Sequence, residues 1–194
     1  MKRNLYLFDF DGTLTKKDTL FDFLRFYNPQ KYFFILLIYI PSFILLKLGI
    51  KRAETVKRNL ISSFLKGQSI EKLKSKSIQY FQVRKDKILR KNAIEFIEKL
   101  NKNDRIVIVS ASLDIWLEPF SEYFNALLIC TNAEYDADIF TGNFTSPNCN
   151  YYEKKKRILE IINLDEYEEI FAFGDSKGDF EMFSLAHKYY LDYF

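Results

Sequence analysis

Four short apolar runs, separated by longer amphipathic stretches, give the chain its main pattern. The runs lie at 4–10, 105–110, 126–130 and 169–173, and in each of them apolar side chains follow one another almost without interruption. Such runs predict strands that are buried on both faces, as the strands of a parallel sheet are.

Helical spacing fills most of the stretches that follow the second run. Apolar residues recur at intervals of three and four over 113–124, 153–162 and 177–186. Strands and helices therefore alternate, which predicts an α/β fold with a doubly wound parallel sheet. Residues 136–144, with a Thr-Gly-Asn turn inside them, predict a small hairpin beside that sheet.

Residues 16–103 interrupt this alternation, because nothing in them has the pattern of a strand. Amphipathic helices are expected in four places: 18–27, 52–65, 70–83 and 86–100. We therefore expect a core built from 1–15 and 104–194, with a helical cap over 16–103 inserted after the first strand.

The segment Tyr32–Leu46 has 15 residues and no charge. A helix of this length spans roughly 22 Å, which is less than the roughly 30 Å of a bilayer's hydrocarbon core. Pro41 predicts two short helices in place of one rod. Two interpretations stay open: a helix buried inside the cap, and a segment that lies in the surface of a membrane.

Composition and charge narrow the possible functions. Two cysteines and one histidine exclude a disulfide scaffold and a zinc site built on paired histidines. The net charge of +3 is unevenly distributed. Residues 16–103 have 20 Lys/Arg and 7 Asp/Glu, whereas the rest of the chain has 9 Lys/Arg and 19 Asp/Glu. The first apolar run meets Asp9 too soon for a signal peptide, so we expect a cytoplasmic protein, either free or peripheral on the membrane's cytoplasmic face.

The segment D-F-D-G-T, from Asp9 to Thr13, is the most informative motif. It places two carboxylates at the carboxyl end of a strand, where α/β sheets bind ligands, and alternation predicts that both emerge together while Phe10 is buried. Asp9 can attack phosphorus, and Asp11 can protonate the leaving oxygen and later activate water. Gly12 permits a close approach to an anion. Such a motif arises by chance in roughly one chain per thousand.

Further polar residues follow the other strands. Asp175 and Asp179, after the last run, predict a Mg²⁺ site together with the first acid pair, although acids there can also cap a helix. Ser110 and the N–H groups after it, Ala111 included, can hold a phosphate. Ser112 is expected to cap the next helix. A cation from the lysines at 154–156 is needed to balance these anions.

These segments, in this order, resemble the haloacid dehalogenase superfamily of aspartate-nucleophile phosphohydrolases over nearly the whole chain. The insert after the first motif resembles the cap of the phosphoserine phosphatase branch. The resemblance implies a Mg²⁺-dependent phosphatase with these roles: nucleophile Asp9, acid/base Asp11, phosphate contacts Gly12, Ser110, Ala111 and Lys154, and metal ligands Asp9, Asp11, Asp175 and Asp179. Asp11 argues against dehalogenase activity, because true dehalogenases lack that second aspartate.

The choice of Lys154 depends on one loop. Residues 148–154 look like the N-C-x-G-x-E-K loop of that branch, but the glycine position is Tyr151 here. Within the branch the basic, apolar cap most resembles phosphatidylglycerophosphatase C-like proteins. In the cap, Asp18 and Arg58 are candidate substrate contacts, and a helix N-cap is the alternative for Asp18.

Two substrates therefore stay open: a membrane phospholipid phosphate such as phosphatidylglycerophosphate, and a small soluble phosphomonoester resembling phosphoserine. Basic residues beside an anionic leaflet contribute about 1 kcal/mol each, which favours contact with an anionic membrane surface. No nucleic-acid recognition motif accompanies the positive charge. Because Asp9 precedes Tyr32–Leu46 while Ser110, Lys154 and Asp175 follow it, that segment cannot cross a bilayer alone.

Overall fold

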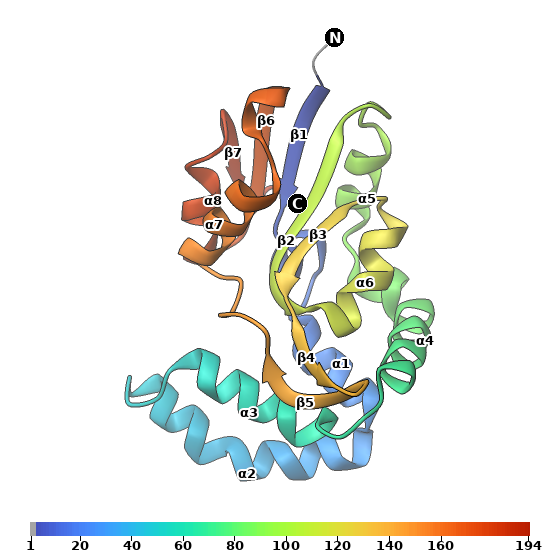
Figure 1. Cartoon of the computed structure of the whole chain (residues 1–194), viewed down its shortest axis with the longest axis vertical. Helices are drawn as coiled ribbons and strands as arrows, with labels where there is room; N and C mark the ends of the chain where they lie inside the picture. The colour runs from blue at the N-terminus through green and yellow to red at the C-terminus, as the bar shows by residue number, and fades with distance from the viewer. Residues whose placement is uncertain (1–2) are drawn as a thin grey trace.

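A five-stranded parallel sheet lies at the centre of the computed structural model, which describes residues 3–194 (Figure 1). Its order is β3-β2-β1-β6-β7, with these bounds: β1 Arg3–Phe8, β2 Arg105–Leu113, β3 Leu127–Thr131, β6 Tyr167–Gly174 and β7 Lys188–Leu191. Phe8 of β1 is in register with Ile108 of β2 and with Phe173 of β6. The carboxyl ends of the three central strands therefore lie side by side, as the sequence predicts.

Helices cover both faces of the sheet, which confirms the doubly wound fold. They are α5 Lys91–Glu98, α6 Asp114–Tyr123, α7 Tyr152–Ile161 and α8 Phe180–Phe183. On one face, Phe96 of α5 packs edge-on against Phe173, with ring centroids 5.2 Å apart. On the other, Leu5 and Val107 join a cluster with Ile158 of α7. The single helix expected over 86–100 is thus divided: its first residues are the end of a helix that closes at Ile88, and the rest is α5, which packs on the sheet.

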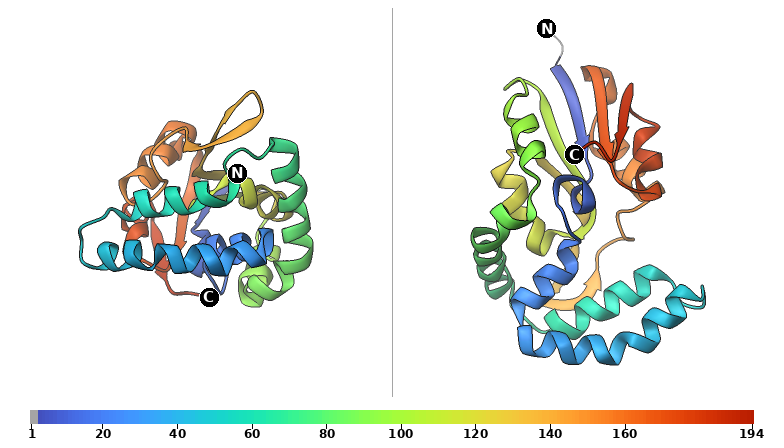
Figure 2. Two further views of the ribbon diagram at one scale, coloured as in Figure 1. Left: turned by 90° about the horizontal axis from the view of Figure 1, so that it is seen from below. Right: turned by 180° about the vertical axis from the view of Figure 1, so that it is seen from behind.

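The remaining elements gather at the carboxyl edge of the sheet. Four helices form what we call the helical insert: α1 Thr19–Tyr27, α2 Pro29–Lys47, α3 Ala53–Leu65 and α4 Ile70–Ile88 (Figures 1 and 2). The hairpin of β4 Ala133–Asp136 and β5 Ile139–Phe144 joins them. Phe140 accepts a hydrogen bond from Gly67 N and donates one to Gln68 O, both at 2.9 Å. The hairpin therefore pairs with the insert, and its predicted place beside the sheet is wrong.

Helix α2 is one continuous helix, so the predicted break at Pro41 is also wrong. Asn28 caps its start by accepting from Lys31 N at 3.0 Å, and Pro29 occupies the first turn, where proline is favoured. Pro41 has no N–H, so the carbonyl of Leu37, four residues earlier, lacks its usual helical hydrogen bond. Both residues are exposed, so this missing hydrogen bond faces solvent.

No residue of α2 is buried, which excludes the interpretation of an enclosed helix. By length and composition this helix could span a membrane.

Candidate active site

Asp9 follows the last residue of β1, and its N–H donates to Phe173 O at 2.9 Å. The chain then leaves the strand and turns through residues 10–14. Gly12 in this turn has a φ of +84°, and a Cβ there would lie 2.0 Å from a carboxylate oxygen of Asp175. Only glycine fits this position. Phe10 is buried against Phe120, with ring centroids 5.2 Å apart.

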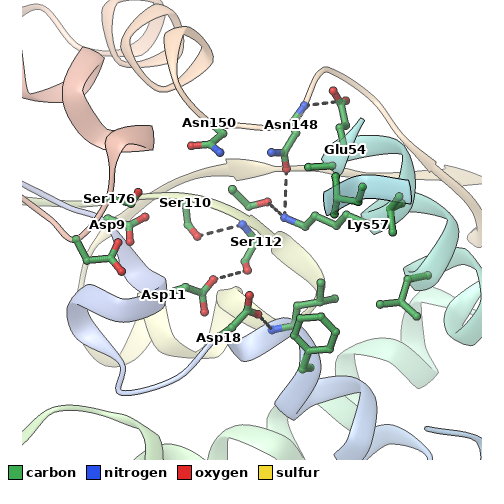
Figure 3. A pocket seen from close by; sticks show the side chains of 18 of the residues that line it. Asp9, Asp11, Asp18, Glu54, Lys57, Ser110, Ser112, Asn148, Asn150 and Ser176 are labelled. Carbon is green, nitrogen blue, oxygen red and sulfur yellow. Dashed lines mark hydrogen bonds between the residues drawn. The ribbon is translucent and has the colours of Figure 1, made fainter. Parts of the chain in front are cut away.

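The two carboxylates of the first motif point to different neighbours. Asp11 Oδ1 accepts from Thr19 N at 2.7 Å and from Thr19 Oγ1 at 2.6 Å, and its Oδ2 accepts from Ser112 Oγ at 2.5 Å (Figure 3). Asp9 contacts Lys154. Phe10 is buried and both acids line one cavity, as the sequence predicts, although β1 ends at Phe8 and the two carboxylates have different hydrogen-bond partners.

Lys154 is the lysine that enters the site. It is 2% exposed, and its Nζ lies 2.5 Å from both Asp9 Oδ1 and Asp179 Oδ1. Lys155 donates to Ser184 Oγ at 2.9 Å on the surface, and Lys156 lies near acids of its own helix. The structure thus distinguishes the three lysines that the sequence left open.

Burial and neighbouring charges shift the pKa values of Asp9 and Lys154. Burial raises the pKa of Asp9 to about 7, and the Lys154 ammonium opposes that rise. Burial by itself would lower the pKa of Lys154, but the Asp9 and Asp179 carboxylates outweigh it and raise the pKa. The lysine therefore stays charged, and it stabilises the ionised form of Asp9.

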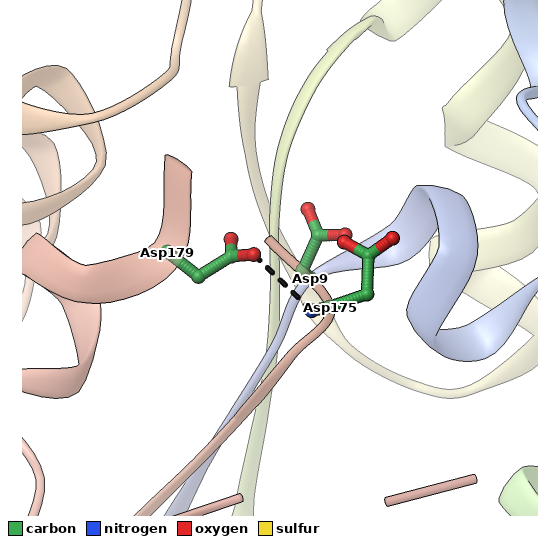
Figure 4. Close-up of side chains that lie close together, drawn as sticks. All are labelled: Asp9, Asp175 and Asp179. Atoms are coloured by element: carbon green, nitrogen blue, oxygen red, sulfur yellow. Dashed lines mark hydrogen bonds between the residues drawn. The ribbon is translucent and has the colours of Figure 1, made fainter. Parts of the chain in front are cut away.

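Three carboxylates converge at the edge of the sheet. Asp9, Asp175 and Asp179 each offer an oxygen, and these oxygens lie within 4.8 Å of one another (Figure 4). Asp179 Oδ2 is held by Ser176 N and Ser176 Oγ, both at 3.0 Å. Burial and the Asp179 charge raise the pKa of Asp175, and the Lys154 ammonium opposes that rise. A donor set of carboxylate oxygens alone suits a hard divalent cation.

The side chain of Asp11 lies outside this cluster. Both of its oxygens are turned to Thr19 and Ser112, so the expectation that its carboxylate ligates the metal is not supported. Ser112 is not a helix cap either, because β2 continues to Leu113 and α6 begins at Asp114. Its backbone N–H donates to Ser110 Oγ at 3.1 Å, and its hydroxyl donates to Asp11 Oδ2.

These residues line a cavity of about 460 Å³ between the sheet edge and the helical insert. The polar part of its wall holds Asp9, Asp11, Ser110, Ala111 and Lys154. The insert contributes apolar side chains, with the charged Asp18, Glu54 and Lys57 among them: Leu20, Phe21, Phe43, Leu46, Val56 and Leu60. The cavity therefore joins a cluster of acids to apolar side chains of the insert.

Sequence reasoning missed Lys57 and chose its neighbour. Lys57 Nζ donates to Ala111 O at 2.6 Å and to Asn148 Oδ1 at 3.2 Å, across the cavity from its own helix (Figure 3). Burial lowers its pKa, against the charges of Asp11 and Asp18. Arg58 does not line the cavity.

The sequence contains a pattern that could have pointed to Lys57. Lys57 stands three, four and seven positions before Leu60, Ile61 and Phe64, on the apolar face of α3, where a charged residue needs a partner. For Asp18 the helix N-cap is confirmed, whereas contact with a substrate stays a prediction. It accepts from Leu20 N at 2.9 Å as the cap of α1, and it lines the cavity.

The loop before α7 keeps its shape without the expected glycine. Tyr151 has a φ of +49°, a left-handed conformation that a tyrosine rarely adopts. Buried Arg157 holds the loop by donating to Pro147 O and, at 2.8 Å, to Ser146 Oγ. The loop also contacts the insert, because Asn148 N donates to Glu54 Oε1 at 3.2 Å. Lys154 is directed inward by this bend.

Comparisons with known proteins agree with this fold and arrangement. The sequence matches the haloacid dehalogenase-like hydrolase family over residues 6–184. Protein CicA of Caulobacter vibrioides is 31% identical over 185 residues, which is 94% of this chain and 82% of that protein.

Solved structures show the same fold. A protein of unknown function from Bordetella pertussis Tohama I has a TM-score of 0.81 at 18% identity, over 97% of this chain and 89% of that one. A phospho-aspartyl intermediate analogue of phosphoserine phosphatase has a TM-score of 0.65 at 22% identity, over 97% and 86%.

The chain belongs to the haloacid dehalogenase-like hydrolase family. Its fold is shared with solved phosphoserine phosphatases, so the superfamily and the fold expected from the sequence are confirmed, and the chain is a hydrolase of this family.

Proposed function

We propose that this enzyme hydrolyses the phosphomonoester of a membrane phospholipid, with Mg²⁺, through an aspartyl-phosphate on Asp9. The observation that carries the proposal is the cavity, because one wall presents Asp9 and Lys154 and the other presents Phe43 and Leu46 of α2. Small polar substrates need no apolar wall, whereas a lipid phosphate places its headgroup and its acyl chains in such a site together.

The residues present can carry out both halves of the reaction. A carboxylate oxygen of Asp9 forms a bond to phosphorus while the ester bond to the leaving oxygen breaks, and Asp11 gives that oxygen its proton. Asp11 then takes a proton from water as the water attacks the phosphoryl group. Inorganic phosphate leaves and Asp9 is restored. Ser110 and Lys154 bind and neutralise the phosphoryl oxygens.

The metal would be held by Asp9, Asp175 and Asp179, whose oxygens already converge. Bound there, Mg²⁺ supplies charge that offsets the phosphoryl group and the acids around it. Activity should therefore be lost in excess chelator and restored by Mg²⁺. Asp175→Asn should lower turnover more than Ser176→Ala, because a charged ligand outweighs a neutral turn residue.

A small soluble substrate is the second candidate. Asp18 lies in the cavity, where an acid could accept a hydrogen bond from a substrate's amino group. The neighbours named as phosphoserine phosphatases have the same fold, and one of them is a substrate-bound complex with a TM-score of 0.63.

A substrate screen separates the two candidates. Phosphatidylglycerophosphate and phosphatidic acid in mixed micelles should be compared with phosphoserine and glycerol 3-phosphate, all with Mg²⁺. We expect kcat/KM to be at least about tenfold higher for a lipid phosphate, since apolar burial of even part of an acyl chain exceeds 1.4 kcal/mol. A higher value for phosphoserine would favour the soluble substrate instead.

A further inference from the structure

Helix α2 exposes a continuous apolar face. Its side chains are between 49 and 66% exposed at six positions: Phe33, Phe34, Leu37, Ile38, Ile40 and Ile44. At roughly 100° per residue these six share about half of the helix circumference, and we call them the outer face of α2. Figure 2 shows α2 as the outermost helix of the insert, on the side away from the sheet. Scattered apolar residues need no explanation, but a contiguous face of this kind does.

The other side of α2 fixes the helix to the molecule. Tyr39 OH lies 2.8 Å from Ser63 Oγ of α3, and Phe43 packs against Phe21 of α1. The chain enters α2 from α1 and returns from it into α3, both in the insert. Because β1 and β2, which precede and follow the insert, pair in one sheet, α2 cannot pass through a bilayer. It can only lie along a surface.

The stretch of sequence that contains the outer face carries only positive charges. Between Asp22 and Glu54 the sequence has no acidic residue and five basic ones: Arg25, Lys31, Lys47, Lys51 and Arg52. A second copy of this chain, meeting the same face by two-fold symmetry, would bring these cations together, which opposes association. An anionic lipid surface complements both the apolar face and its cationic rim.

We propose that the outer face of α2 docks onto the surface of an anionic phospholipid bilayer and lies in the interface without crossing it. Phe43 and Leu46, on the inner side of the same helix, line the catalytic cavity. The docked enzyme therefore has its cavity beside the lipids, and a lipid phosphate reaches Asp9 along α2. This last step rests on the function proposed above, whereas the docking itself does not.

Flotation with vesicles tests the docking, using the full chain and phosphatidylcholine vesicles with or without phosphatidylglycerol. The double variant Phe34→Glu/Ile38→Glu changes the outer face. The matched control is Ile78→Glu/Val83→Glu on α4, whose side chains are 49 and 55% exposed. We expect the parent and the control to float with the anionic vesicles, and the outer-face variant to bind at least about tenfold more weakly. Raised salt should release part of the bound parent.

Turnover of para-nitrophenyl phosphate reports on the fold, and it should be equal in all three proteins. The docking is overturned if the outer-face variant binds anionic vesicles as the parent does, or if the parent prefers them no more than neutral ones. A parent that dimerises in ultracentrifugation without binding vesicles, and becomes monomeric on Phe34→Glu/Ile38→Glu, would assign the face to a second copy and overturn it too.

The same proteins separate the two proposals. Vesicle binding without hydrolysis of any micellar lipid phosphate would sink the proposed substrate and leave the docking in place. Hydrolysis of micellar lipid phosphate by a parent that does not bind vesicles would overturn the docking and support the proposed substrate.

Discussion

The Nζ atom of Lys154 lies 2.5 Å from carboxylate oxygens of both Asp9 and Asp179, and all three residues are almost excluded from water. Two buried carboxylates so close together repel each other unless a cation lies between them. The same ammonium is placed where the charge of a phosphoryl group would arrive. If the proposed function is right, stability and phosphate binding both depend on this side chain.

Replacing Lys154 by methionine should expose that dependence. Methionine keeps the length of the side chain but leaves two buried acids unpaired, so we expect a loss of about 3 to 5 kcal/mol in the free energy of unfolding. Turnover of a phosphate ester should fall by at least about a hundredfold. Urea unfolding and steady-state kinetics measure the two effects.

Lys155→Met is the matched control. Its ammonium reaches Ser184 Oγ and Glu181 on the surface, where such contacts contribute about 0 to 1 kcal/mol. We expect turnover within twofold of the parent. Equal losses in the two variants would contradict the role given to Lys154.

The backbone of Tyr151 carries strain that glycine would relieve. With a φ of +49° and a ψ of −125°, this residue adopts a conformation that costs a side-chain-bearing residue about 1 to 3 kcal/mol. Tyr151→Gly should therefore leave the protein as stable as the parent or stabilise it by about 1 kcal/mol. Thermal unfolding measures the change.

The next residue provides the control. Tyr152 is equally exposed but begins α7, and glycine in a helix costs about 1 kcal/mol. Tyr152→Gly should be the less stable variant. The reverse order of the two melting temperatures would show that the bend is not strained.

Most of the residues that the sequence predicts for the site lie together in the structure, because they follow strands and parallel strands end at one edge. Sequence reasoning could not orient the side chains. Asp11 turns to Thr19 and Ser112, which come from two other elements, and no local pattern predicts those partners. Lys57 was missed because a basic run hides the one lysine that lies on an apolar helix face.

At the scale of elements, Asp114 ties the start of α6 to β4. Its Oδ1 accepts from Ile115 N at 2.8 Å and from Ala133 N at 3.1 Å. Burial raises the pKa of this carboxyl to about 6, and the two N–H groups oppose the rise. The folded protein therefore holds a proton on Asp114 in a range where the unfolded chain has already lost it.

This shift predicts the sign of a pH effect. Between about pH 4 and pH 6 the folded state binds the extra proton, so the contribution of Asp114 to stability falls as the pH rises through that range. We expect the parent to lose about 1 to 3 kcal/mol relative to Asp114→Asn between about pH 4 and pH 7. Urea unfolding at both pH values checks this, and parallel curves for the two proteins would contradict it.

Two elements that the pattern predicted, but divided or placed wrongly, share one cause, which is a partner distant in sequence. Helix α2 continues past Pro41 because its inner side packs on α1 and α3. The hairpin joins the insert because the backbone of Phe140 bonds to the turn after α3. Local spacing predicts that an element exists, but not which neighbour decides its ends.

Over the whole molecule, the uneven distribution of charge follows the division into two parts. The basic excess lies mainly in the helical insert, and the acidic excess in the residues of the sheet and its helices, which include the three converging carboxylates. The cavity lies where these parts meet, beside the three converging carboxylates. Family and fold are established, and the nucleophile is the central claim.

Trapping the covalent intermediate tests that claim most directly. Asp11→Asn should accept the phosphoryl group slowly and hardly release it, because water then lacks its base. The variant is mixed with Mg²⁺ and a phosphate ester, quenched in acid, and its peptides are examined by mass spectrometry. We predict one phosphoryl group on Asp9, and none when Asp9→Asn is treated in the same way. An unmodified Asp9 in the Asp11→Asn protein, or turnover at the parent's rate by Asp9→Asn, would contradict the account.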